Sequence, residues 1–197
     1  MYKKQMVFQK ITCLFCVISS AMMAIYSLGI LTDIYDSFYS TMTNPNDLTD
    51  TKVPGSIIYY DMQGFNKLFL YFSIGLILLS CLLYLTNTNV RRKYYVGNYV
   101  STIIYAVAAL FVSIWSHVQI SGFKKQFLTT VDFAALEEFA KLWKKTYSES
   151  TFWFDLHYFV GGLVILSAIL LVINLFWKRK MMAEEDRLIE EGKEALA

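Results

Sequence analysis

The stretch GGLVILSAILLVINLF, residues 161–176, contains no charged residue and no alternation of polar and apolar positions. Strands of a membrane barrel alternate at every second residue, so this stretch predicts a helix. It lies inside a charge-free run from Leu156 to Trp177, and three similar runs cover Ile11 to Thr32, Leu68 to Val90 and Tyr94 to Phe123. A hydrocarbon core about 30 Å thick requires about 20 helical residues. We therefore predict an all-α integral membrane protein with a bundle of four transmembrane helices.

The composition supports this assignment, because 56% of the residues are hydrophobic and only 17% are charged. A soluble domain of this length does not normally bury so much apolar side chain. The first 24 residues resemble a signal peptide in their basic start and apolar middle, but the apolar run is long and ends without an Ala-x-Ala site. We expect this segment to remain as the first transmembrane helix.

We expect one membrane domain over residues 1–197. The transmembrane helices are expected at about residues 11–32, 68–88, 98–118 and 154–177, with outer loops at 33–67 and 119–153, an inner connection at 89–97 and a tail at 178–197.

Basic residues predict the orientation, because translocating lysine and arginine across a membrane is unfavourable. They cluster without acids at the N-terminus and in the second connection, and again directly after the fourth helix, at Lys3, Lys4, Lys10, Arg91, Arg92, Lys93, Lys178, Arg179 and Lys180. Both termini are thus expected in the cytoplasm and both long loops outside. A bacterial plasma membrane is the expected location, since the richness in Lys, Asn, Ile and Tyr is typical of an AT-rich genome.

The two long loops are expected to form an extracytoplasmic cap. Turn chemistry at Pro45 and at Pro54-Gly55 breaks the first loop. In the second loop, Leu136, Phe139 and Trp143 share a helical face with nearby apolar residues, which predicts an amphipathic helix. This helix is expected either to lie in the membrane interface or to pack over the bundle and the first loop.

The only two histidines occur in similar surroundings, His117 in WSHVQISG and His157 in WFDLHYFVGG. Helical rise places His117 about 28 Å from the start of the third helix and His157 about 30 Å from the end of the fourth, so the two are expected at the same height. Adjacent helices could bring the imidazoles together to bind a haem or a quinone. We favour the interpretation as an aromatic belt, where His and Trp are common without any ligand, and therefore expect no cofactor.

No metal site is expected. Cys13 and Cys16 have the C-x-x-C spacing of a redox pair, and Cys81 lies in the second helix, but cysteine is also a common apolar filler and the outer loops contain no cysteine to exchange with.

Apart from the histidines, the spans contain no ionisable group other than Cys and Tyr. Ion and proton pathways are usually marked by buried acids or bases. We expect neither a pump nor an enzyme, and the net charge of +2 without a concentrated basic surface does not suggest nucleic-acid binding.

Three functions remain open. The first is a non-catalytic accessory or scaffold subunit of a larger membrane complex, for example a transporter. The second is a small haem- or quinone-binding protein that uses the two histidines. The third is a transport component for an uncharged or apolar solute. Expected interface or cap residues are Trp115, Trp143, Trp153, Phe139, Tyr59 and Tyr60.

Overall fold

A computed structural model describes residues 2–44, 47–88, 95–143 and 150–194. Four long helices make up most of it: α1 (Tyr2–Thr41), α2 (Ile58–Thr88), α3 (Tyr95–Thr130) and α5 (Phe152–Glu194). All four are long and apolar enough to cross a membrane. The chain is therefore a multi-pass membrane protein built on helices, as the sequence predicts.

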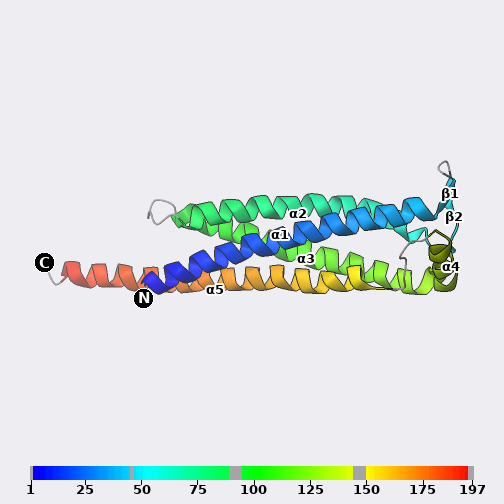
Figure 1. Ribbon diagram of the computed structural model, residues 1–197. Helices are drawn as coiled ribbons and strands as arrows, with labels where there is room; N and C mark the ends of the chain where they lie inside the picture. The colour runs from blue at the N-terminus through cyan, green and yellow to red at the C-terminus, as the bar shows by residue number, and fades with distance from the viewer. Residues whose placement is uncertain (1, 45–46, 89–94, 144–149, 195–197) are drawn as a thin grey trace.

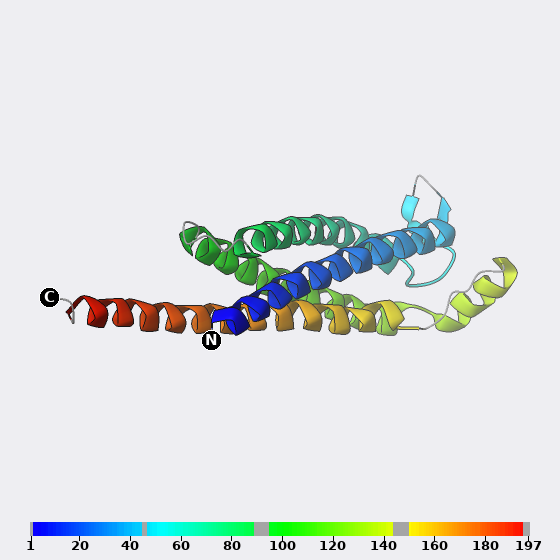
Figure 2. The same ribbon diagram turned by 60° about the vertical axis from the view of Figure 1, so that its left-hand side comes forward.

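The helices form a four-membered ring in which α1 lies between α2 and α5, and α3 closes the ring on the other side. Figure 1 shows both termini at one end of the bundle, which we call the terminal end. The opposite end carries the shorter elements and is called the α4 end. In Figure 2, α5 continues past the other helices at the terminal end, where its residues are exposed.

Each of the four helices runs beyond the span expected from hydropathy. Helix α1 continues to Thr41 and α2 begins at Ile58, so much of the expected loop 33–67 is helical. Likewise, α3 continues to Thr130 into the expected loop 119–153. Hydropathy reports where a helix meets hydrocarbon, whereas the helix itself ends only where the backbone turns.

Two short strands were not expected from the sequence. Strands β1 (Met42–Asn44) and β2 (Asp47–Thr51) form an antiparallel hairpin after α1. The backbone N–H of Lys52 then donates to the carbonyl of Thr41 at 2.7 Å, which returns the chain to the end of α1. The fold is thus helical with one small hairpin at the α4 end.

Helix α4 (Phe133–Trp143) begins where Asp132 accepts a hydrogen bond from the N–H of Ala135 at 3.0 Å. Its apolar face is anchored, since Leu136, Phe139 and Ala140 are buried. The N–H of Asp132 also donates to the Pro54 carbonyl at 3.0 Å, which ties this turn to the segment before α2. The turn before α4 is therefore hydrogen-bonded to the segment that precedes α2.

The buried residues of α2 recur at alternating spacings of three and four. One row contains Met62, Phe69, Leu76 and Leu83, and the other contains Tyr59, Asn66, Ser73, Ser80 and Asn87. Such a 3.5-residue repeat is typical of left-handed helix bundles. The face of α2 away from the bundle exposes large apolar residues such as Leu78 and Leu85, which suits a lipid environment. The bundle interior is thus partly polar and its outer surface apolar.

Polar side chains join the helices at the terminal end. Gln5 of α1 donates to Gln9 and to Asn174 of α5, both at 3.0 Å. Gln9 donates to the carbonyl of Asn87 in α2, and the Asn87 amide donates to Ser101 of α3 at 3.1 Å. In hydrocarbon such interhelical bonds specify which helices pack together and in which register.

A second polar cluster surrounds Tyr105, whose side chain is fully buried. Its hydroxyl lies 3.0 Å from Ser20 Oγ and 3.2 Å from the Cys16 carbonyl of α1, and 3.3 Å from Ser167 Oγ of α5. One phenol of α3 therefore connects three helices near the middle of the bundle.

Candidate functional site

Helices α3 and α5 bring the two histidines together near the α4 end. The ring centroids of His117 and His157 are 6.2 Å apart, with 30° between the ring planes. His117 is exposed on the side of α3, whereas His157 is only 1% exposed. The sequence predicted their common height, and the rotation of the two helices places both rings on the same side.

A cleft of about 290 Å³ lies between α3 and α5 at this point. Its lining comes from about one and a half turns of α3 and about two and a half turns of α5: Ser113, Ile114, His117, His157, Tyr158, Gly161, Gly162 and Ile165. The lining contains no Asp, Glu, Lys or Arg. Ile114 and Tyr158 are exposed on the outer surface of the bundle, so the cleft opens toward the membrane.

His157 is held by aromatic rings and by one hydroxyl. Its ring lies 5.7 Å from that of Tyr26 and 6.0 Å from that of Phe69, centroid to centroid. Its Nε2 lies 3.4 Å from Ser116 Oγ. Because Ser116 already donates its hydroxyl proton to the Val112 carbonyl at 2.6 Å, it can only accept from His157. The proton of the neutral imidazole is therefore assigned to Nε2.

Two buried polar atoms beside the cleft have no hydrogen-bond partner within the described part of the chain, Ser113 Oγ and His157 Nδ1. Ser113 is 1% exposed and lines the cleft. Neighbouring helix serines, such as Ser116, donate to their own helix instead. Buried polar groups without a partner are rare in proteins and call for an explanation.

Glycines leave room in the cleft. A Cβ at Gly161 would lie 3.6 Å from His157 Nε2, in ordinary van der Waals contact. A Cβ at Gly162 would meet no heavy atom within 4 Å. The two glycines thus leave space on the α5 side of the cleft, where it opens toward lipid.

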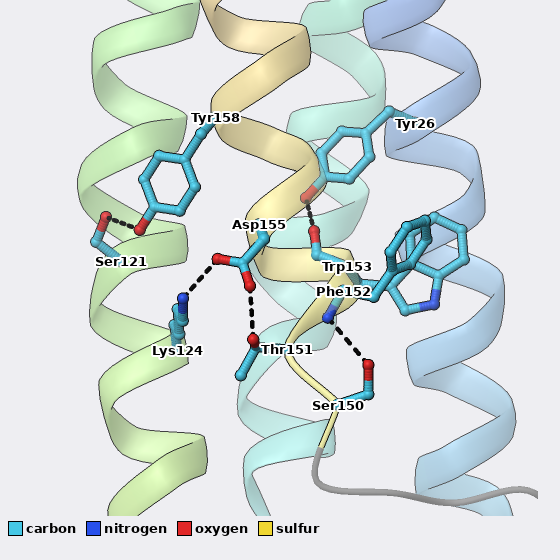
Figure 3. A network of polar contacts seen from close by, with 9 residues as sticks. All are labelled: Tyr26, Ser121, Lys124, Ser150, Thr151, Phe152, Trp153, Asp155 and Tyr158. Atoms are coloured by element: carbon cyan, nitrogen blue, oxygen red, sulfur yellow. Dashed lines mark hydrogen bonds and ion pairs between the residues drawn. The ribbon is translucent and has the colours of Figure 1, made fainter.

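Figure 3 shows the polar contacts that hold α3 against the first turns of α5. Lys124 Nζ lies 2.5 Å from Asp155 Oδ1, and the Thr151 hydroxyl donates to Asp155 Oδ2 at 2.6 Å. One turn further along α5, the Tyr158 hydroxyl lies 3.4 Å from Ser121 Oγ. These contacts position the rim of the cleft at its α4 side.

The expected interface aromatics lie in different surroundings. Trp115 is partly buried and its ring is 5.1 Å from that of Phe65 and 5.3 Å from that of Phe72. Trp153 packs on α1, where its carbonyl accepts a hydrogen bond from the Tyr26 hydroxyl at 2.7 Å. Both tryptophans contribute to packing between helices.

The remaining expected residues lie at the α4 end. Tyr59 is buried against Phe127, with 6.4 Å between ring centroids, and Phe139 is buried on the inner face of α4. Tyr60 is 42% exposed. The side chain of Trp143 lies outside the described residues.

Within the described ranges, no group of three or more His, Cys, Asp or Glu side chains could hold a metal ion. Cys13 and Cys16 are free and buried in the bundle, and Cys81 is free and exposed on α2. The sulfur of Cys16 lies 3.8 Å from the Ser167 carbonyl, as part of the cluster around Tyr105. These contacts are those of packing residues.

Sequence reasoning missed the neutral polar residues. A search for ionisable groups passes over Ser113 and the interior amides, although they mark the bundle interior. Their signal was available, because Asn66, Ser73 and Asn87 recur at multiples of seven residues within apolar α2. Such a row predicts an inward-facing polar stripe.

Comparison of the chain with protein-family profiles, curated protein sequences and solved structures gives no match. The class of the protein is therefore defined by the fold alone: a multi-pass membrane protein with four long apolar helices.

Proposed function

We propose that the protein is a non-catalytic accessory or scaffold subunit of a larger membrane complex. The observation that carries this proposal is the organisation of the interior, where neutral polar side chains from different helices bond one another. The clusters around Gln5 and Tyr105 are examples. A bundle closed in this way has lipid-facing and end surfaces available for function, and its described residues form no charged path through the middle.

The α4 end is the contact surface that this proposal favours. Leu136 and Phe139 anchor one face of helix α4. Leu142 of the same helix is 75% exposed. An apolar side chain on an anchored element can bind a partner with little loss of conformational freedom. We propose the extramembrane part of another membrane subunit as the partner.

The test is purification from native membranes in mild detergent, followed by mass spectrometry. We expect a partner in fixed stoichiometry with the full chain and its loss in Leu142→Glu. The matched control is Ala134→Glu, which adds the same charge at another exposed position of α4. Absence of a stoichiometric partner, or equal recovery with both variants, contradicts the proposal.

We further propose that both termini face the cytoplasm of a bacterial cell and that the α4 end faces outward. The positions of the basic residues support this orientation. A membrane-impermeant maleimide should label Lys141→Cys in intact cells and should label Arg187→Cys only after lysis. The reverse pattern contradicts the orientation.

A further inference from the structure

We propose that the cleft between α3 and α5 binds the head group of a neutral, lipid-soluble molecule of the quinone class, which enters sideways from the membrane. This site is separate from the α4 contact surface. The observations behind it are the position of the cleft, its opening, its hydrogen-bonding groups and its size.

The position suits an amphiphile. His157 is five residues from the start of α5, which places it about 8 Å along the helix axis, within the apolar span but close to one end. A head group at this depth lies near the membrane surface, and an attached apolar chain can follow the groove past Ile165 toward the bilayer centre. Lipid-soluble molecules already concentrate in this layer.

The opening is lateral. Ile114 is 57% exposed and Tyr158 is 42% exposed on the outer surface, and a Cβ at Gly162 would meet no heavy atom within 4 Å. A ligand dissolved in the bilayer can therefore reach the floor of the cleft without crossing water. The lack of a side chain at Gly162 is what keeps this entrance wide.

The hydrogen-bonding groups select a neutral head. Ser113 offers a hydroxyl without a partner in the described residues, and His117 presents an imidazole at the rim. Both can donate to a carbonyl oxygen. The lining contains no Lys or Arg, and Lys124 near the rim is already paired with Asp155, so no lysine or arginine is available in the lining to hold an anionic head. A ring with carbonyl oxygens and no charge matches these donors.

The size separates a quinone from a haem. A volume of about 290 Å³ is at the lower end of the range of small-molecule sites and suits a single six-membered ring with its substituents. A tetrapyrrole is much larger. In addition, His157 Nε2, a nitrogen that could bind iron, faces Ser116 at 3.4 Å. The site as built therefore favours a hydrogen-bonded ring over an iron-bound macrocycle.

The experiment measures binding of a benzoquinone with a ten-carbon side chain to the purified full chain in lipid nanodiscs. Binding is followed by equilibrium dialysis and by quenching of tryptophan fluorescence. We expect saturable binding, weakened at least 10-fold in Gly162→Leu, whose Cβ meets no heavy atom within 4 Å and whose longer side chain should fill the entrance. The matched control is Gly75→Leu in α2, another glycine with open space around its Cβ and outside the cleft.

A second variant tests recognition of the head group. Ser113→Ala should weaken binding by about 3- to 10-fold, the effect of one hydrogen bond. Ser73→Ala is its control, because Ser73 is equally buried but bonds only the Phe69 carbonyl of its own helix. Circular dichroism confirms that each variant is folded.

Three outcomes overturn the proposal. The first is absence of saturable binding, or equal binding by Gly162→Leu and Gly75→Leu. The second is equal competition by a ten-carbon alkane, which would mark the cleft as a contact for ordinary lipid chains. The third is a Soret band after addition of haemin that disappears in His117→Ala, which would assign the cleft to haem.

Discussion

The hydroxyl of Tyr105 should stabilise the bundle through contacts that a phenylalanine cannot make. It lies within 3.3 Å of polar atoms on both α1 and α5, while the ring itself is fully buried. Tyr105→Phe removes the oxygen and keeps the ring packing. The variant therefore isolates the polar contribution of one phenol that joins three helices.

The magnitude follows from these contacts. Interhelical hydrogen bonds in membrane proteins contribute about 0.6 kcal/mol on average and about 1.7 kcal/mol at most. The Tyr105 hydroxyl joins α3 to two other helices, so its removal should cost about 1–2 kcal/mol. Ser167 is not orphaned by this change, because it already donates to the Val164 carbonyl at 2.8 Å.

The assay is reversible unfolding of the full chain in mixed micelles, followed by circular dichroism during a titration with a denaturing detergent. Tyr71→Phe is the matched control, because Tyr71 is 68% exposed on the outer face of α2. It should change the free energy of unfolding by less than about 0.5 kcal/mol. If both variants unfold at the same midpoint, the interior cluster does not stabilise the bundle as reasoned.

Three further changes test the packing at the α4 end. Gly29→Ala should destabilise the bundle by about 1–3 kcal/mol in the same assay, because its Cβ would lie 2.9 Å from the Trp153 ring. Gly55→Ala should loosen the loop before α2 and expose it to protease, because φ is +80° and the Cβ would lie 1.9 Å from a backbone oxygen. Glu137→Gln should leave the unfolding midpoint at neutral pH unchanged, because its pair with Lys141 is fully exposed. The hydrogen bond from Lys141 lowers the pKa of Glu137, so the small contribution of the wild-type pair is present above the usual glutamate pKa and is lost as the pH falls.

Matched controls make these changes interpretable. Gly75→Ala is the control for Gly29→Ala, because a Cβ at Gly75 meets no heavy atom within 4 Å. Equal midpoints for the two alanine variants would show that Trp153 moves without cost. For Gly55→Ala, proteolysis indistinguishable from wild type would contradict the close approach to the turn after α3. For Glu137→Gln, a shifted unfolding midpoint at neutral pH would show that the exposed pair is coupled to packing.

The four spans could be predicted from the sequence because transfer of a residue into hydrocarbon depends mainly on that residue and its neighbours along the helix. Leu156 to Trp177 contains no charge, and no arrangement of the other helices changes this. The common height of His117 and His157 follows in the same way, since helical rise is constant. The order of residues along the chain was thus sufficient to predict the fold class, the number of spans and the common height of the two histidines.

Only the tertiary structure decided which helices are neighbours and how each is rotated about its axis. The pairing of α3 with α5 brings His117 within 6.2 Å of His157, and the same pairing creates the cleft beside Ser113 and Gly162. These features depend on contacts between residues far apart in the chain. A local apolar pattern is compatible with several ring orders, because lipid covers any apolar face equally well.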